Sequence, residues 1–236
     1  MDVFRKPFHF ATGLFVAASL VLPAAAATKY PQMGPLSRYL MPDRQAEIAL
    51  ARTAAPPAIS RDATVLVFTP RGYVRAERGG NGFTCLVERS WTSPFGSTEF
   101  WNFKNRSPIC YNPPASRTVL LYTLRRADLV VSGRTKAAML ASIRAAVIRK
   151  QLPVPEPGSM SYMLSKAGYL ADGAGAWRPH LMIYAPVSAG ADDGASWGAN
   201  LPGSPVVFDT SHRILPEPET IFMIPVAHWS DGTAAP

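Results

Sequence analysis

The chain has 236 residues, and only two of them are cysteines. A chain of this length can bury its own core, so a disulfide-stapled miniprotein is excluded and one globular domain is the simplest arrangement. Its 23 prolines, about twice average usage, favour short elements joined by rigid turns over a bundle of long helices.

The formal net charge of +8 is unevenly divided along the chain. Residues 28–150 carry 19 Lys and Arg against 7 Asp and Glu, whereas residues 151–236 carry 3 against 8. The basic half suits an anionic partner such as an envelope component, or it complements the acidic half within one fold. No basic run is long enough to suggest an electrostatic stripe, so a nucleic-acid partner is not expected.

Residues 1–27 have the features of a secretory signal peptide. Arg5 and Lys6 form a basic start, an apolar run from Phe10 to Leu22 follows, and small residues precede Thr28. The run of 13 residues is shorter than the roughly 20 that a membrane-spanning helix needs. We therefore expect an exported protein, periplasmic or secreted, cleaved near Ala27; the alternative is an uncleaved anchor.

Residues 28–62 form a proline-rich lead with one short helix, and residues 63–236 form the globular domain. Asp43 is a suitable N-cap for that helix, and Pro56-Pro57 must end it. Three strands are expected next, at Val65–Phe68, from Tyr73, and at Phe83–Arg89. Because Asn81-Gly82 favours a tight turn, these strands are expected to form a meander.

Cys85 and Cys110 bracket the densest aromatic cluster of the chain. In an oxidising compartment two cysteines usually pair, so we predict a Cys85–Cys110 disulfide. Closing a loop of about 26 residues stabilises a fold by about 3.5 kcal/mol on the chain-entropy estimate. The aromatic residues inside the loop are expected to belong to the core.

The second half of the chain alternates helical and strand patterns. Helices are expected at 115–131, 135–150 and 159–170, and strands at 181–184, 206–208 and 221–224. Together these elements predict a single α+β domain. It has an antiparallel sheet of about five to six strands, two or three packed helices and one disulfide.

No known catalytic motif is present. The sequence contains no G-x-S-x-G elbow, Walker loop, H-E-x-x-H or C-x-x-C. The spacing of the histidines matches no metal site, so neither a metal nor a cofactor is predicted. Motifs therefore do not decide whether the protein is an enzyme.

Two histidines are candidates for acid–base chemistry. His180 begins a predicted strand and follows a glycine-rich loop that contains Asp172, while His228 lies three residues before Asp231. A base is often placed at such a strand end. The alternatives are a histidine that caps a strand and a simple Asp-Gly turn, and His212 is expected at the surface.

Trp177 and Trp197 are candidate binding residues because both fall in predicted loops, where aromatic faces can stack on ligands. Two functions therefore remain open. The first is a non-enzymatic exported protein that binds a small ligand or envelope component around Trp177, His180 and Trp197. The second is a hydrolase or metal-dependent enzyme that uses His180 and His228 with Asp172 or Asp231.

Overall fold

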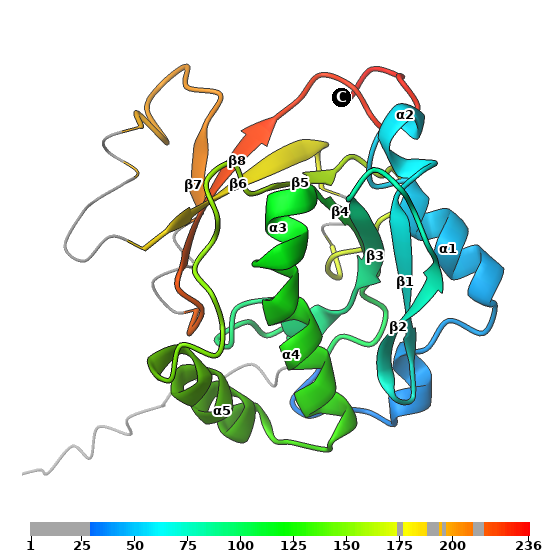
Figure 1. Ribbon diagram of the computed structural model, residues 1–236, viewed down its shortest axis with the longest axis vertical. Coiled ribbons are helices and arrows are strands. Elements are labelled where there is room, and N and C mark those ends of the chain that lie inside the picture. Colours follow the sequence, from blue (N-terminus) through cyan, green and yellow to red (C-terminus); the bar gives the residue numbers. More distant parts are fainter. Residues whose placement is uncertain (1–28, 174–176, 188–193, 195–196, 210–214) are drawn as a thin grey trace, which may run out of the picture.

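One sheet holds eight strands in the described residues of this computed structural model, which are 29–173, 177–187, 194, 197–209 and 215–236 (Figure 1). In chain order the strands are β1 (Thr64–Thr69), β2 (Gly72–Glu77), β3 (Thr84–Glu88), β4 (Ser107–Tyr111), β5 (Met160–Met163), β6 (His180–Pro186), β7 (Val207–Asp209) and β8 (Glu219–Pro225). Their spatial order is β2-β1-β3-β4-β5-β6-β8-β7. The α+β class is confirmed, with more strands than the five to six expected. The predicted signal peptide and His212 lie outside the described residues.

Helices lie on both faces of the sheet (Figure 1). They are α1 (Arg44–Arg52), α2 (Pro57–Ser60), α3 (Pro113–Arg117), α4 (Leu120–Val131) and α5 (Lys136–Ile148), with 3-10 turns η1 (Leu36–Tyr39) and η2 (Ser90–Thr92). Asp43 caps α1 as predicted, since its carboxylate accepts a hydrogen bond from the Gln45 amide. Thr135 caps α5 in the same way through the Ala138 amide. No helix of the described residues is long and apolar enough to cross a membrane.

The predicted meander is wrong. Strand β1 pairs with β2 on one side and, in parallel, with β3 on the other. The loop after β2 passes the start of β1, where the Gly80 amide donates to the Asp62 carbonyl and the Thr64 amide donates to the Phe83 carbonyl. Because this loop passes the N-terminal end of β1, β3 pairs with the edge of β1 that β2 does not occupy. Strand β2 therefore lies at the edge of the sheet.

The helix expected at 159–170 is also wrong, because Met160–Met163 form strand β5. Tyr162 pairs with Cys110 of β4 on one side and with Leu181 of β6 on the other. A short isolated helix has little stability of its own, so pairing with two neighbouring strands prevails.

The disulfide between Cys85 and Cys110 is confirmed, and it joins residues that face each other on β3 and β4. Strand β4 was not expected from the sequence. Both cysteines are fully buried beneath α1, in a cluster that includes Ile48 and Val65. Such a bond indicates an oxidising compartment.

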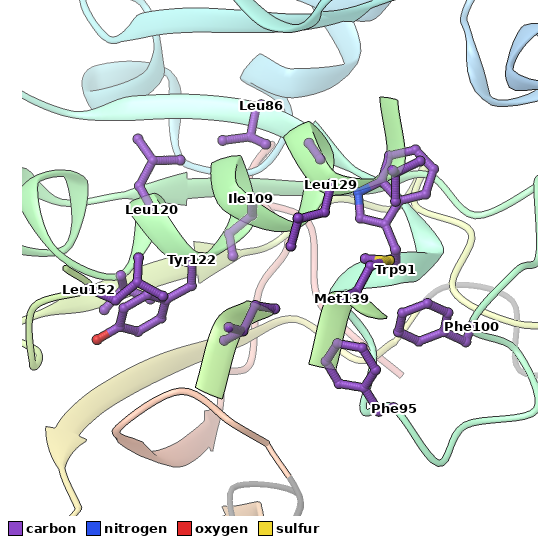
Figure 2. Packing of buried hydrophobic residues seen from close by; sticks show 14 of the residues in the cluster. Leu86, Trp91, Phe95, Phe100, Ile109, Leu120, Tyr122, Leu129, Met139 and Leu152 are labelled. Carbon is purple, nitrogen blue, oxygen red and sulfur yellow. The ribbon is translucent and has the colours of Figure 1, made fainter. Parts of the chain in front are cut away.

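The larger core lies on the opposite face of the sheet, beneath α3, α4 and α5. Figure 2 shows Leu86 and Ile109 of the sheet packed near Leu129 of α4, with Trp91 and Met139 nearby. Phe95 and Phe100 belong to this core, so the aromatic residues inside the disulfide loop do have the structural role expected of them.

Candidate functional site

A cavity of about 200 Å³ lies on the face of the sheet that carries α4. Side chains alternate along a strand, so every second residue of β6 and β8 borders it. These residues are His180, Met182 and Tyr184 of β6 and Glu219, Ile221 and Met223 of β8. Val119, Tyr122, Thr123 and Arg126, at the start of α4 and along it, line the cavity from above. The cavity is therefore a space between the sheet and one helix.

Three glutamates line this cavity, namely Glu88, Glu217 and Glu219. Their exposed fractions are only 8%, 4% and 6%. Glutamate is almost never so deeply buried unless it is paired. Three buried glutamates on a core-facing surface are unusual, so the partners of each carboxyl group decide how it is stabilised.

Glu217 is paired with Arg126 of α4. The guanidinium Nε and Nη2 donate to the two Glu217 carboxylate oxygens at 2.7 and 2.9 Å. Its Nη1 donates to the carbonyls of Trp91 and Ser93, at 2.8 and 2.7 Å. Four of the five N–H groups of this guanidinium are therefore hydrogen-bonded, and the pair fixes the segment before β8 to α4.

Glu88 is held by two hydroxyl groups. The Tyr111 hydroxyl and the Thr123 hydroxyl each donate to Glu88 Oε1 at 2.8 Å. Burial raises the pKa of the Glu88 carboxyl, and the two hydrogen bonds only partly oppose this effect. The Glu88 site thus favours a neutral acid more than an exposed glutamate does.

One carboxyl oxygen of Glu219 lacks a hydrogen-bond partner of this kind among the described residues. Its Oε2 is buried, and no described residue forms a hydrogen bond with it. Burial, reinforced by the nearby Glu217 carboxylate, raises the pKa of Glu219 well above its usual range. Without a ligand, Glu219 is therefore held as a neutral carboxylic acid into the pH range where an exposed glutamate is ionised.

Replacing Glu219 with glutamine is expected to flatten the pH dependence of stability. The native state binds the Glu219 proton more tightly than the unfolded chain does. The free energy of unfolding of the wild type should therefore fall as pH rises above about 4.3, the unfolded value. Urea denaturation across pH measures this slope.

Half-exposed Glu156, whose pKa the Arg117 guanidinium lowers, provides the control variant E156Q. Equal slopes in wild type and E219Q would contradict the assignment.

His180 and Trp177 border the cavity at the other end of β6, where Ser107 also lies. His180 Nδ1 lies 2.8 Å from the Arg178 carbonyl, while its buried Nε2 has no hydrogen-bond partner among the described residues. Burial lowers the pKa of His180, which favours the neutral ring. Trp177 packs against this ring at 5.4 Å between centroids and is 47% exposed, so it stands where the cavity meets solvent.

The carboxyl end and the histidine end of the cavity are far apart. In the β6–β8 ladder His180 pairs with Pro225, whereas Glu219 pairs with Pro186 at the opposite end. Strands rise about 3.3 Å per residue, so these ends are about 20 Å apart. The two unpartnered polar atoms, Glu219 Oε2 and His180 Nε2, therefore belong to residues at opposite ends of this ladder.

The remaining sequence candidates lie elsewhere. Asp172 is paired with Lys29 and Lys104 and accepts hydrogen bonds from Tyr30 and Tyr169, which together hold its pKa below its usual range.

His228 is exposed near the C-terminus and forms an isolated β-bridge with Ala234. Near it, Asp231 accepts from Thr233 and pairs with Lys166, and both contacts lower its pKa. Neither aspartate hydrogen-bonds to His180.

Trp197 does not line the cavity. It is 53% exposed and stacks on Phe222, at 4.6 Å between ring centroids. Phe222 lies on the face of β8 opposite Ile221, since neighbouring strand residues point to opposite faces. Of the predicted site residues, Trp177 and His180 are the two that the structure brings together at the cavity.

Sequence reasoning did not identify the glutamates, Arg126 or the two tyrosines Tyr111 and Tyr184. The sequence does contain a signal for Glu219, the alternation of residues along its strand. Glu219, Ile221 and Met223 alternate with Thr220 and Phe222, which puts a carboxyl group on the same face as buried apolar side chains. An acidic residue in the inward register of a strand is a marker of a functional cavity.

Within the described parts of the chain, no group of three His, Cys, Asp or Glu side chains is arranged to hold a metal ion. The cavity instead offers carboxyl, hydroxyl and imidazole groups together with an apolar surface. Comparison with protein-family models, curated proteins and solved structures finds no match to the chain.

Proposed function

We propose that the protein is an exported, non-enzymatic binding protein whose cavity holds a small molecule. The observation that carries this proposal is the cavity itself, which combines buried carboxyl groups with a lining of methionine, aromatic and aliphatic side chains. Its volume of about 200 Å³ exceeds the ~150 Å³ of an engineered cavity that binds benzene. Ligand sites typically have this form, mostly apolar with a few convergent polar groups.

Two unpartnered polar atoms support binding over a purely structural role. Glu219 Oε2 and His180 Nε2 are both buried and, within the described residues, form no hydrogen bond. A buried polar group without a partner costs about 1–3 kcal/mol. A ligand that supplies partners to these atoms would recover this free energy on binding, so the cost of the unbound state favours the complex.

Export is supported by two independent observations. The basic start, the apolar run and the small residues before Thr28 are typical of a signal peptide cleaved near Ala27. The Cys85–Cys110 disulfide suits the oxidising compartment to which such a peptide directs a protein. We infer a periplasmic or secreted protein that meets its ligand outside the cytoplasm.

A fragment screen tests the binding function. The full chain, expressed with its own N-terminus, is screened by thermal shift against small amphipathic compounds. Compounds that stabilise the wild type should lose this effect in Met182→Trp, which fills the cavity, and should act less on Trp177→Ala. Trp197→Ala removes an equally exposed tryptophan outside the cavity and should behave as wild type. Finding no stabilising compound, or equal stabilisation of all three variants, would overturn the proposal.

A second candidate is an enzyme that uses His180 in acid–base chemistry. The neutral imidazole with a free Nε2 favours it, because a general base needs an available lone pair. His228, Asp172 and Asp231 are not partners of His180 in this arrangement, since its Nδ1 lies on the Arg178 carbonyl and its Nε2 has no hydrogen-bond partner among the described residues. Turnover of any cavity ligand that disappears in His180→Ala, with binding retained, would favour this second function.

A further inference from the structure

We propose that the ligand is a small organic cation, an ammonium or amidinium group on an apolar body, whose charged group lies between Glu219 and Glu88. This inference rests on the proposed binding function and adds the chemical class of the ligand. Four carboxyl groups line the cavity, those of Glu88, Asp209, Glu217 and Glu219, and Arg126 is the one Arg or Lys among its described lining residues. A bound cation would balance the charge that Glu219 acquires when it loses its proton.

Arg126 is poorly placed to bind an anionic ligand, because Glu217 already neutralises its charge and four of its five N–H groups are hydrogen-bonded. Its Nε and Nη2 donate to Glu217, and its Nη1 donates to two carbonyl groups. The guanidinium also lies over the Phe95 ring, 4.6 Å from its centroid. Among the described lining residues, an anion would therefore meet carboxyl groups and no unpaired cation, which is strongly unfavourable.

Glu219 offers the acceptor that a cation needs. Its side chain is 94% buried, lines the cavity and has an unpartnered Oε2. Beside it, the Tyr184 hydroxyl is 2.8 Å from Ser161 Oγ and keeps a lone pair for a further donor. The rings of Tyr184 and Tyr111 lie 6.4 Å apart and add aromatic surface to the same end. Carboxylate, hydroxyl and ring face together suit an ammonium group.

An apolar body fits the rest of the cavity. Met163, Met182 and Met223 line it between the carboxyl end and Trp177. Methionine side chains are flexible and polarisable, so they adapt to aromatic or aliphatic groups. A ligand whose charge lies at Glu219 would extend along β6 and β8 toward Trp177 and the unpartnered His180 Nε2.

Such binding would be linked to proton release. To form an ion pair, Glu219 must lose its proton. Burial and the nearby carboxyl groups of Glu217, Glu88 and Asp209 favour the protonated form, whereas the charge of Arg126 favours the ionised form. Glu88 must do the same against its own burial. The affinity for an amine should therefore rise from mildly acidic to neutral pH, and should fall only where the amine itself deprotonates.

Matched probes test the charge of the ligand by isothermal titration calorimetry. Phenethylamine, 2-phenylethanol and phenylacetate share an aromatic body and differ in charge; hexylamine, hexanol and hexanoate repeat the comparison with an aliphatic body. An amine should bind at least about tenfold tighter than its alcohol, and the acid should bind weakest. Glu219→Gln should remove this preference because the amine loses more affinity than the alcohol does, and Glu156→Gln should keep it.

The outcomes separate the two proposals. Equal or tighter binding of the alcohols or acids would overturn the cation proposal and leave the binding function standing. Binding by none of the six probes would also overturn the cation proposal. The binding function itself would fail only if the broader fragment screen found no ligand dependent on the cavity.

Discussion

Replacing Arg126 with methionine is expected to lower the free energy of unfolding by about 3–5 kcal/mol, because it leaves a buried charge without its partner. The Glu217 carboxylate would lose two hydrogen bonds, and the carbonyls of Trp91 and Ser93 would lose their shared donor. Both charged side chains are nearly inaccessible, at 3% and 2% exposure, so water cannot replace the lost contacts. Urea denaturation at neutral pH measures the loss.

The matched control is Arg144→Met, since Arg144 is exposed on the neighbouring helix α5. It should show no measurable change. If Arg126→Met is too unstable to purify, the double variant Arg126→Met/Glu217→Leu removes both charges and should recover a large part of the loss. A loss below about 1 kcal/mol in Arg126→Met would place this pair in the class of surface ion pairs and contradict its burial.

Removal of the disulfide is the second large change. Cys85→Ala/Cys110→Ala should lower the free energy of unfolding by about 3.5 kcal/mol, because the unfolded chain regains the freedom of the open loop. The five residue pairs of the β3–β4 ladder remain in the folded state, so the fold itself should persist. Chemical denaturation of both proteins under non-reducing conditions measures the difference.

The state of the cysteines is checked directly on the same protein. Thiol labelling in denaturant should find no free thiol before reduction and two afterwards. Wild-type protein reduced in denaturant should then refold with the stability of the double-alanine variant. Two free thiols in the unreduced protein would contradict both the disulfide and the oxidising compartment inferred from it.

Local signals in the sequence predicted most of the elements. Asp43 is the N-cap expected for the first helix, and the helix expected at 135–150 is found as α5. Alternation predicted which face of β3 carries Cys85 and which carries Leu86, and the two residues do belong to different core clusters. These features depend on interactions within a few residues, so the sequence contains them.

The order of the strands depends on distant partners, which local patterns do not encode. The Gly79–Gly82 loop contains a turn signal, yet contacts with Asp62 and Thr64 decide where the chain goes next. Strand β5 is a strand because it lies between β4 and β6. The parallel β1–β3 pair and the cavity between sheet and helix could therefore not be predicted from periodicity.

The candidate site likewise contains residues that local sequence signals reveal and residues that only the fold brings together. Trp177 and His180 were found because they lie near each other in the sequence, at the start of one strand. Glu88 comes from β3, Glu217 from the segment before β8 and Glu219 from β8 itself, and they meet only because all three face α4. Their functional meaning depends on burial and on their distance from other charges, which a sequence without aligned relatives does not reveal.

The most direct test of the central claim is a crystal structure of the full chain with phenethylamine. We predict the ammonium nitrogen within hydrogen-bonding distance of Glu219 Oε2, with the ring among Met182 and Met223 on the side toward Trp177. Phenethylamine bound outside the cavity, or inside it with the ring against Glu219 and the ammonium toward solvent, would contradict the account.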